Sequence, residues 1–498
     1  MEKSSIKNYF LYFTLFVSGG VILIIEIAGT RILAPFFGST IFVWSSLITT
    51  TLGFLALGYF LGGVLADKYP KAYCFYFAIF LGGGAALLLI KLNQHLLVFS
   101  DKFGFKFGPL VSSALLFALP LLLLSMAGPF AIRLLSRERE HSGHVSGMVF
   151  GISTVGSLAG ALIAGFYLVP NFSLSNVFVF SVAAIMFISG SGLILEKAPR
   201  WMIALAIVLF ALFLAIPFLK YGQAKEGVSI IEKDQSFYSD LKVVELPYIK
   251  TVLMDGAPQS VFGKIKGEVF AQETEQIRRL LEESYEPDAK VLVLGFGVGT
   301  AADIFPKELQ IDYIELDPKM IELAEEHFAF SLDGNDRIII SDARSFLRKT
   351  EKKYDLIFAD LYHASAIPLH THTKEALELA KERLNPEGIF LSNLVAGPKS
   401  ELAASVIKTM KQVFPKVLTS ARLGEEEKEV TNILAYGILD ENFEPYFKFR
   451  HKKFEIDDSA GSVITDDKNP METLSLERFG EFRKSAISVF GYQPLFAI

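Results

Sequence analysis

The sequence predicts a chain of two different parts: a bundle of about seven membrane-spanning helices, followed by an α/β domain built on a parallel sheet. Three observations lead to this prediction. Apolar segments long enough to cross a membrane fill the chain before residue 220. Apolar strand-like runs then alternate with helical stretches after residue 290, which is typical of a parallel sheet covered by helices on both faces. Glycines and acidic residues follow several of these strands, at the edge where such a sheet binds its ligands.

The charge is divided unevenly between the two parts. Residues 1–222 hold 14 of the 48 Lys and Arg and 7 of the 54 Asp and Glu, so their net charge is about +7 and that of the rest about −13. An acidic C-terminal part favours cationic small molecules over nucleic acid, and we expect no nucleic-acid partner. The single cysteine, Cys74, excludes an intramolecular disulfide framework.

Residues 1–222 are predicted to be an integral membrane domain in the lipid bilayer. Each apolar segment is about long enough to cross a ~30 Å hydrocarbon core. Glu26 is the one acidic residue inside a predicted span, which makes it a functional candidate unless it lies near the interface and pairs with Arg31. The seven segments lie near 9–30, 42–65, 73–91, 109–132, 146–169, 174–195 and 201–219.

An odd number of spans places the N-terminus and the C-terminal part on opposite faces of the membrane. Nine Lys and Arg flank the spans on the N-terminal face and six on the other face. The positive-inside rule therefore places the C-terminal part outside the cell. A nucleoside ligand for that part argues the reverse. We expect a multi-pass protein of the cell membrane with its C-terminal part in the cytoplasm; one miscounted span would reverse the charge argument.

Residues 228–285 are predicted to form a small antiparallel β subdomain with a connecting helix. Three strand-like segments come first, and the last of them runs into the turn Asp255-Gly256. A rough apolar stripe then predicts a helix over 268–283. The strand-like segments are 228–231, 241–246 and 251–254.

Residues 286–498 are predicted to form a Rossmann-like domain, a three-layer α/β sandwich. Continuous apolar runs separated by helical stretches require a sheet that is buried on both faces. The expected strands are 291–294, 311–315, 337–341, 355–359 and 388–394, with two more near 416–420 and 432–438, and the expected helices lie near 299–306, 318–327, 343–349, 373–384 and 400–412.

Gly295, Gly297 and Gly299 follow the first of these strands and open a helix. Glycines there let the backbone turn tightly and approach a ligand that a side chain would exclude. Glu315 ends the next strand, where a carboxylate can accept both hydroxyls of a ribose. The spacing differs from the dinucleotide pattern Gly-x-Gly-x-x-Gly and a second half-fold is absent, so the site better fits S-adenosylmethionine and its relatives.

Asp342 and Asp360 end the third and fourth strands. Asp342 is expected to accept the amino group of an adenine, and Asp360 to lie beside the pocket. Each acid taken singly is explained equally well as a helix N-cap or a surface charge. Four such positions at the ends of consecutive strands together predict a ligand crevice.

The segment from about residue 228 to 395 resembles the spermidine synthase (polyamine aminopropyltransferase) family. Met254-Asp-Gly-Ala-Pro-Gln259 is similar to that family's Leu-Asp-Gly-x-x-Gln, and Gly267-Glu-Val-Phe-Ala-Gln-Glu273 to its Asp-Glu-x-x-Tyr-(His/Gln)-Glu. The glycines, Glu315, the Asp342-Ala343 pair and Asp360 follow in the family's order. The seven spans and the ending Ile464-Thr-Asp-Asp-Lys-Asn-Pro-Met-Glu472 resemble its membrane-fused branch.

The resemblance implies a membrane-bound transferase that moves an aminopropyl group from decarboxylated S-adenosylmethionine to a small amine such as putrescine, with release of methylthioadenosine. It implies no prosthetic group, and we expect a homo-oligomer. Asp360 is the implied catalytic residue, because an amine with a pKa of about 10.4 is protonated at neutral pH and a carboxylate can anchor it and help remove its proton. The implied donor contacts are Gln272, Gly295, Gly297, Gly299, Glu315, Asp342 and Ala343, and the expected acceptor contacts are Gln259, Tyr362 and His363.

Four positions depart from the family's pattern. Val298 stands where the family has the Asp that binds the aminopropyl ammonium, and His363 where it has a second Asp. Ala271 replaces a Tyr, and Ser239 stands at the place of an early Gln. Three of the four changes remove groups that bind amines, so an acceptor other than putrescine is left open.

Two alternative functions remain open from the sequence. A methyltransferase that uses S-adenosylmethionine on a membrane-delivered substrate needs no acid at Val298. The other alternative is a transporter with a nucleoside-sensing domain, and Glu26 inside a predicted span is the residue that supports it. His363, His370 and His372 share one loop, but no cysteine or defined ligand spacing accompanies them, so we predict no metal site.

Overall fold

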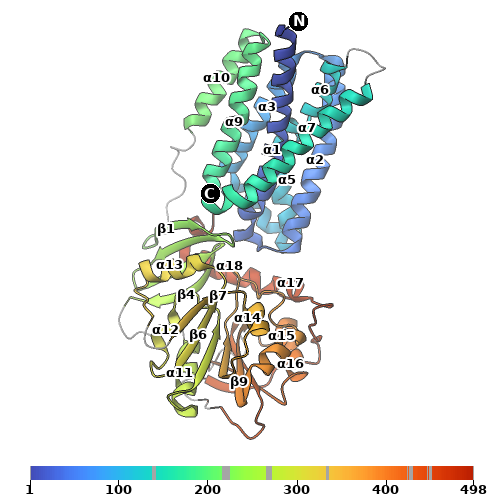
Figure 1. Cartoon of the computed structure of the whole chain (residues 1–498). Helices are drawn as coiled ribbons and strands as arrows, with labels where there is room; N and C mark the ends of the chain where they lie inside the picture. Colours follow the sequence, from blue (N-terminus) through green and yellow to red (C-terminus); the bar gives the residue numbers. More distant parts are fainter. Residues whose placement is uncertain are drawn as a thin grey trace. The chain divides into compact units, whose positions relative to one another are not determined.

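The chain forms two compact units, Met1–Gln223 with Phe496–Ile498, and Ala224–Leu495 (Figure 1). Within the described residues, the first unit is helical and all strands belong to the second. The computed structural model describes residues 2–136, 142–215, 225–264, 272–332, 336–422, 424, 430–445, 447 and 451–496.

Six helical segments of the first unit are long and apolar enough to cross a membrane, so the prediction of seven spans is not confirmed within the described part of the chain. The seventh expected span corresponds to α10 (Arg200–Ala215), whose apolar stretch is Arg200–Leu212. The six segments are Ile6–Phe37, Ile41–Lys68, Ala72–Leu89, Asn93–Leu135, Ser142–Asn171 and Leu174–Leu195.

The six segments contain the other helices of the bundle. Two of the segments are built from several consecutive helices. Their bounds are α1 (Glu2–Phe37), α2 (Ile41–Lys68), α3 (Ala72–Lys91), α4 (Asn93–Ser100), α5 (Gly104–Ser125), α6 (Ala127–Leu135), α7 (Ser142–Ile163), α8 (Val169–Asn171) and α9 (Leu174–Leu195).

Glycines permit a close contact between α1 and α7. A Cβ on Gly156 would lie 2.0 Å from the carbonyl oxygen of Phe16, and one on Gly160 would lie 2.3 Å from that of Gly20. Small residues at this spacing let helix backbones approach each other in a membrane. Glu26, also in α1, interacts with the Thr51 side chain of α2.

The second unit begins with a four-stranded antiparallel sheet in the order β1-β2-β3-β4. Asp255 (φ 45°) and Gly256 (φ 76°) form the two-residue turn between its last two strands. Both central residues of a type I′ hairpin turn need positive φ, which Asp and Gly tolerate well. The strands are β1 (Ser229–Gln235), β2 (Asp240–Glu245), β3 (Ile249–Met254) and β4 (Ala257–Gly263), and α11 (Gln272–Ser284) follows them.

An eight-stranded sheet in the order β12-β10-β11-β9-β8-β5-β6-β7 forms the centre of the second unit. Strands β9, β8, β5, β6 and β7 run parallel, whereas β11, β10 and β12 pair antiparallel. Its strands are β5 (Lys290–Leu294), β6 (Gln310–Glu315), β7 (Arg337–Ile340), β8 (Tyr354–Ala359), β9 (Leu384–Ala396), β10 (Lys416–Arg422), β11 (Thr431–Ile438) and β12 (His451–Phe454).

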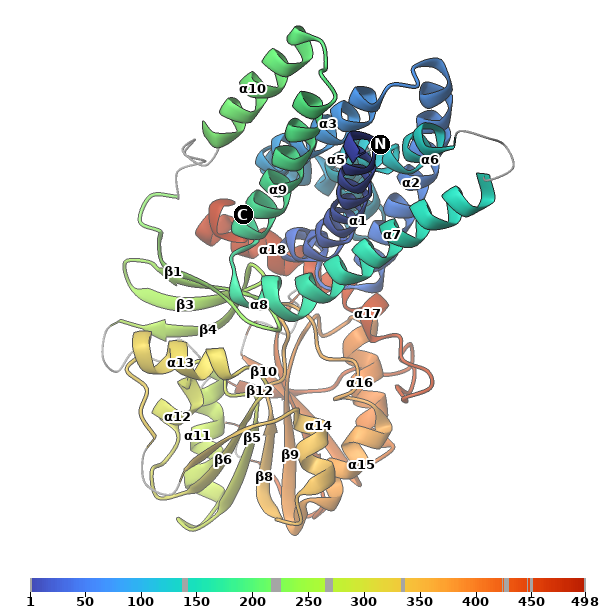
Figure 2. The same cartoon turned by 45° about the horizontal axis from the view of Figure 1, so that its top comes forward.

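Two hydrophobic cores cover the two faces of this sheet. Helices lie on both sides of the sheet (Figure 2). Val291 and Val293 of β5 belong to one core, and the alternate residues Leu292 and Leu294 belong to the other. One core includes residues of α11 and α13, and the other includes residues of α14, α15 and α16. The helices are α12 (Thr300–Ile304), α13 (Pro318–His327), α14 (Ala343–Lys349), α15 (Lys374–Glu382), α16 (Glu401–Lys411), α17 (Met471–Leu474) and α18 (Leu476–Phe490).

The expected strands and helices between 290 and 438 are confirmed to within a few residues. Strand β12 and helices α17 and α18 were not among the expected elements. Helix α18 is important for the site, because it carries two side chains that line the pocket.

Candidate ligand-binding site

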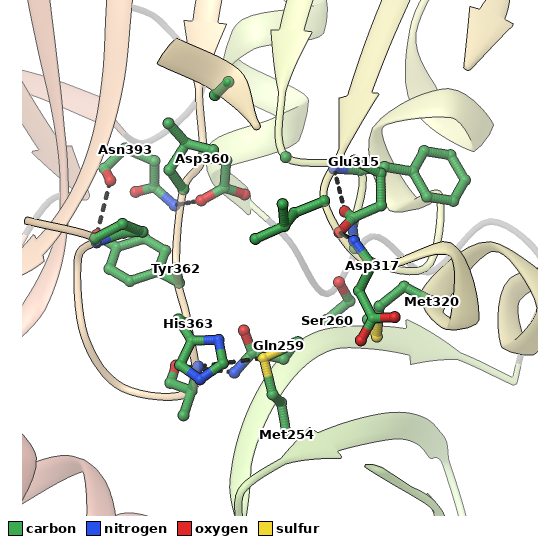
Figure 3. Close-up of a pocket in the computed structure, with 18 of the residues that line it drawn as sticks. Met254, Gln259, Ser260, Glu315, Asp317, Met320, Asp360, Tyr362, His363 and Asn393 are labelled. Carbon is green, nitrogen blue, oxygen red and sulfur yellow. Dashed lines mark hydrogen bonds between the residues drawn. The ribbon is translucent and has the colours of Figure 1, made fainter. Parts of the chain in front are cut away.

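A pocket with a volume of about 460 Å³ lies at the carboxyl ends of the parallel strands. This volume falls within the ~300–1,000 Å³ that is usual for small-molecule sites. Figure 3 shows Asp360, Tyr362 and Asn393 on one side of the pocket, with Glu315 and Asp317 on the other. All of the lining residues belong to the second unit.

The loop after β5 lines the pocket with backbone atoms. Gly295 (φ 98°) and Gly297 (φ 61°) are lining residues in a conformation that favours glycine. A Cβ on Gly295 would lie 2.3 Å from the carbonyl oxygen of Asp360, and one on Gly297 would lie 2.5 Å from the hydroxyl of Ser260. Gly299 (φ 82°) is the N-cap of α12. The loop is therefore tightly enclosed by β4 and by the residue that follows β8.

Glu315 ends β6, and its carboxylate holds the glycine loop. Oε2 accepts hydrogen bonds from the backbone N–H groups of Phe296 (3.1 Å) and Gly297 (3.3 Å), and Oε1 accepts one from Asp317 (2.9 Å). Burial raises the pKa of Glu315, and these three hydrogen bonds partly offset that rise. The carboxylate lines the pocket at a fixed position, and Oε1 keeps acceptor capacity for a ligand hydroxyl.

Asp342 is both a helix N-cap and a lining residue of the pocket. Its Oδ1 accepts from the backbone N–H of Ser345 at 2.8 Å, and its Oδ2 lies 2.7 Å from Nε2 of His370. Burial alone would raise the pKa of Asp342, but the hydrogen bonds with His370 and Ser345 lower it overall. Ala343, the first residue of α14, lines the pocket beside it.

Asp360 follows β8 and lines the pocket. Its Oδ1 accepts a hydrogen bond from Nδ2 of Asn393 at 3.0 Å. Although its surface faces the cavity, enclosure by the surrounding protein raises the pKa of Asp360, whereas the Asn393 hydrogen bond and the charge of Arg478 lower it. The raised pKa makes Asp360 a stronger base than an ordinary aspartate.

Tyr362 is fixed through its hydroxyl. The hydroxyl donates to the carbonyl oxygen of Asn393 at 2.8 Å and accepts from the backbone N–H of Val395 at 2.7 Å. Burial raises the pKa of Tyr362 to about 12. Both partners belong to β9, so the Tyr362 ring is held as a rigid apolar wall of the pocket.

A tight turn after Tyr362 carries His363. His363 and Ala366 exchange two backbone hydrogen bonds of 2.8 and 2.9 Å, and Ala364 has a φ of 52°. Nε2 of Gln259 donates to the carbonyl oxygen of Ala364 at 2.9 Å, so Gln259 supports this turn from β4. Nε2 of His363 lies 3.7 Å from the Asp255 carboxylate.

The three histidines of this loop have three different partners. His363 lies near Asp255, and His370 contacts Asp342. His372 is buried, and its Nε2 lies 2.8 Å from the hydroxyl of Ser392. Burial lowers the pKa of His372 to about 4.

Several positions singled out from the sequence are not part of the described pocket wall. Gly299, a predicted donor contact, and Ser239 are not among the lining residues. Val298 is fully buried in the hydrophobic core between the sheet and α13. Gln272 begins α11, but its side chain and the whole of Ala271 lie outside the described residues.

Several lining residues escaped the sequence analysis. Asp317 caps α13, Ser260 comes from β4, and Asn393 from the middle of β9. Arg478 and Phe482 come from α18, more than a hundred residues after Asp360. No local motif marks these positions; only the fold brings them to the strand ends.

Residues 271–423 match the spermine/spermidine synthase domain family. A probable polyamine aminopropyl transferase of Bifidobacterium longum (strain NCC 2705) is 27% identical over 219 residues, which are 37% of this chain and 48% of that protein. The chain thus spans about half the length of this relative. Polyamine aminopropyltransferase 2 of Aquifex aeolicus is 24% identical over 463 residues, or 85% of this chain and 87% of that protein.

Other similarities are more distant or shorter. The crystal structure of a probable spermidine synthase from Corynebacterium glutamicum is 21% identical, with a TM-score of 0.37, and covers 45% of this chain and 82% of that chain. The eEF1A lysine and N-terminal methyltransferase of Bos taurus is 31% identical over 160 residues, which are 29% of this chain and 22% of that protein.

Proposed function

Since the C-terminal half carries a spermine/spermidine synthase domain, we propose that the chain is a membrane-bound polyamine aminopropyltransferase. Its donor is decarboxylated S-adenosylmethionine and its acceptor is a small amine. One observation carries the proposal: Asp360 lies on the opposite side of one pocket from Glu315, with the glycine loop between their strands (Figure 3). The Asp360 carboxylate can bind an amine, and the Glu315 carboxylate can bind the ribose of a nucleoside.

The donor half of the pocket is assigned to the ends of β5, β6 and β7. Glu315 would accept ribose hydroxyls, and Asp342 with Ala343 would contact the adenine. Gly295 and Gly297 also line this half of the pocket, and glycine is needed there because a side chain at either position would collide with Asp360 or Ser260. Gln272 remains a proposed donor contact by resemblance alone.

The acceptor half of the pocket is assigned to Asp360 and its neighbours. Asp360 would hold the acceptor's ammonium group and take one proton from it, which frees the nitrogen lone pair. The nitrogen then attacks the aminopropyl carbon bound to the positively charged sulfur. The carbon–sulfur bond breaks, its electron pair neutralises the sulfur, and methylthioadenosine leaves without needing an acid. Tyr362 and Gln259 would position the acceptor, the first as a wall and the second by supporting the His363 turn.

The first test is the reaction itself. Purified full-length protein in detergent is given decarboxylated S-adenosylmethionine and a panel of amines, and methylthioadenosine release is measured. Asp360→Asn should lower kcat/KM by about 10²–10⁴-fold, which is the usual contribution of a general base. Asp288→Asn, at an exposed carboxylate near the opposite end of the strands, should leave it unchanged. Full activity in Asp360→Asn would remove this residue from the mechanism.

Methyl transfer from S-adenosylmethionine is the second candidate. Val298 favours it, because this position provides no carboxylate for an aminopropyl ammonium. Calorimetry separates the two candidates: tighter binding of S-adenosylmethionine than of its decarboxylated form, with release of S-adenosylhomocysteine in turnover, would support methyl transfer.

A further inference from the structure

Helix α18 places a guanidinium group inside the pocket. Arg478 is only 4% exposed, yet it is one of the lining residues, together with Phe482 of the same helix. Its guanidinium carbon lies 4.4 Å from the centre of the Tyr362 ring and 5.5 Å from that of the Phe482 ring. The two rings fix the planar group by cation–π contacts.

The charge of Arg478 is not balanced by an ion pair within the described residues. Nη1 donates to the carbonyl oxygen of Ser365 at 2.5 Å, while Nε is shielded from solvent and has no hydrogen-bond partner. The Asp360 carboxylate favours the charged form of Arg478, but the two groups form no ion pair among those described. A buried charge without a partner is expensive, often by several kcal/mol. An anion on a bound ligand would supply the missing partner, and a carboxylate fits the planar donor set of a guanidinium.

The position of Arg478 indicates which ligand would carry that anion. Glu315 and Asp342 follow β6 and β7, on one side of β5. Tyr362, on which Arg478 stacks, follows β8 and is bonded to β9, on the other side of β5. Arg478 therefore lies on the side of Asp360 that is away from the proposed nucleoside contacts, where the acceptor extends.

The charges on this side do not suit a simple diamine. An acceptor with a second ammonium group would bring that group towards Arg478, and like charges repel strongly where water is scarce. The resemblance leads one to expect a second acid at position 363. This chain has His363 there, so the position provides no carboxylate for a second ammonium group.

We propose that Arg478 binds a carboxylate on the acceptor, so that the acceptor is an amino acid-like amine and not an unsubstituted diamine. This inference rests on the proposed aminopropyl transfer, because it assumes that Asp360 receives the acceptor's amine. It names the class of acceptor that the proposed function leaves open.

Matched acceptors that differ by one carboxylate test the proposal. Full-length protein is assayed with decarboxylated S-adenosylmethionine and either putrescine or ornithine, then with cadaverine or lysine. The wild type should show at least a tenfold higher kcat/KM for the carboxylated member of a pair. Arg478→Gln should abolish that preference mainly through KM, and Arg478→Lys, which keeps the charge but loses the planar fork, should restore part of it. Lys484→Gln, an exposed substitution on the same helix, should keep the wild-type preference.

Each other outcome has a definite meaning. A wild type that prefers the plain diamines overturns the inference and leaves aminopropyl transfer standing. If no amine consumes decarboxylated S-adenosylmethionine, the proposed function fails, and the inference fails with it. S-adenosylmethionine carries a carboxylate that its decarboxylated form lacks, so the donor is the other possible partner of Arg478. Both donors are therefore compared in the wild type and in Arg478→Gln. If the substitution changes the preference between donors and not the preference between acceptors, the assignment to the acceptor is wrong. The comparison of acceptors in the wild type decides the question even if Arg478→Gln does not fold.

Discussion

At the residue scale, the surroundings of Asp360 change its pKa in opposite directions. Enclosure by protein raises its pKa, whereas the amide of Asn393 and the charge of Arg478 lower it. The net rise makes Asp360 a better base, and the two neighbours keep it ionised to lower pH than enclosure alone would allow. We therefore predict that Asn393 influences the proposed reaction through Asp360, as a positioning residue.

Asn393→Ala should shift the acid side of the pH–activity profile to higher pH. A base works only when deprotonated, so kcat/KM falls as pH drops through its pKa. Removing the hydrogen bond that favours the charged carboxylate raises this pKa further. The measurement is kcat/KM against pH for both proteins. Protonation of the acceptor amine affects both equally, so the difference between the profiles isolates Asp360.

Asn432→Ala is the matched control, because Asn432 also lines the pocket and has no hydrogen bond to Asp360 among those described. Its profile should coincide with that of the wild type. Coincidence of the Asn393→Ala profile with the wild type would show that the amide does not influence Asp360.

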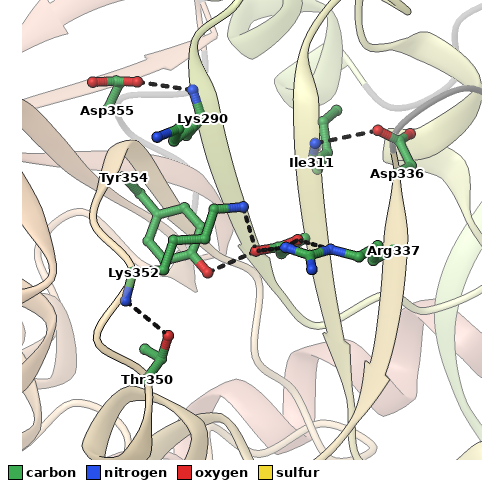
Figure 4. Close-up of polar contacts among 9 residues, drawn as sticks. Lys290, Ile311, Asp336, Arg337, Thr350, Lys352, Tyr354 and Asp355 are labelled. Atoms are coloured by element: carbon green, nitrogen blue, oxygen red, sulfur yellow. Dashed lines mark hydrogen bonds and ion pairs between the residues drawn. The ribbon is translucent and has the colours of Figure 1, made fainter.

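At the scale of single elements, β6 carries two buried acids with different tasks. Glu315 at its end lines the pocket, whereas Asp312 lies within a charge network. Figure 4 shows three members of this network, Arg337, Lys352 and Tyr354. Asp312 accepts hydrogen bonds from Tyr354 (2.7 Å), Lys352 (2.8 Å) and Arg337 (3.0 Å). Burial alone would raise the pKa of Asp312, but these hydrogen bonds and positive charges lower it overall. The network links β6 to β7 and to the start of β8.

Asp312→Asn should destabilise the protein by about 2 kcal/mol at neutral pH, the usual cost of breaking a hydrogen-bonded charge group. This corresponds to a fall in Tm of roughly 4–8 °C for a unit of this size. A carboxyl with a depressed folded-state pKa stabilises the fold above its unfolded pKa of about 3.9 and loses that effect as pH falls. The difference from the wild type should therefore persist down to about pH 4 and shrink only below it, as pH falls towards the lower folded-state pKa. Thermal unfolding of the full chain in detergent at several pH values checks this.

Asp288→Asn, at an exposed position, is the control and should leave Tm unchanged at every pH. An Asp312→Asn protein that is as stable as the wild type at pH 7 would contradict the assigned role of the network.

Some elements of the fold can be predicted from the sequence and others cannot. Strands such as β5 and β8 are continuous apolar runs with sharp ends, so the sequence alone is enough to place Glu315, Asp342 and Asp360 at strand ends. Strand β12 is only His-Lys-Lys-Phe and shows no apolar period. Helix α18 does have apolar residues at helical spacing, Leu476, Phe479, Ala486 and Phe490, but this pattern says nothing about which polar side chain reaches the pocket. Arg478 was missed because only the fold brings it to the strand ends. The partner of Asp360 on β9, Asn393, was missed because it is one polar residue inside a long strand.

At the scale of the whole chain, the number of spans decides the orientation. Segment 201–219 reads as a seventh span because its composition is apolar, but composition does not fix how far the helix continues, and the described apolar part ends at Leu212. Six spans return the chain to the face on which it started. Lys220 and Lys225, which follow the last span, then join the N-terminal face. The balance of flanking Lys and Arg becomes eleven against four.

For six spans, this balance agrees with the expected cytoplasmic position of the C-terminal unit. The positive-inside rule places the more basic face inside the cell, and with six spans that face includes both the N-terminus and the C-terminal unit. The four residues left on the other face are Arg31, Lys91, Lys102 and Lys106. With seven spans the charge count conflicts with the proposed nucleoside ligand, and with six spans it agrees.

Cysteine labelling can test this topology, because Cys74 is the only native cysteine. In a Cys74→Ser background, Ser39→Cys lies in the loop between the first two spans, and Asn442→Cys lies at an exposed position of the C-terminal unit. A membrane-impermeant thiol reagent should label Ser39→Cys in intact cells, and Asn442→Cys only after the membrane is permeabilised. Labelling of Asn442→Cys in intact cells would place the C-terminal unit outside, where the supply of a nucleoside donor made in the cytoplasm would need transport across the membrane. Protection of Asn442→Cys in intact cells would support the six-span count, because only an even number of spans places the C-terminal unit on the face of the N-terminus.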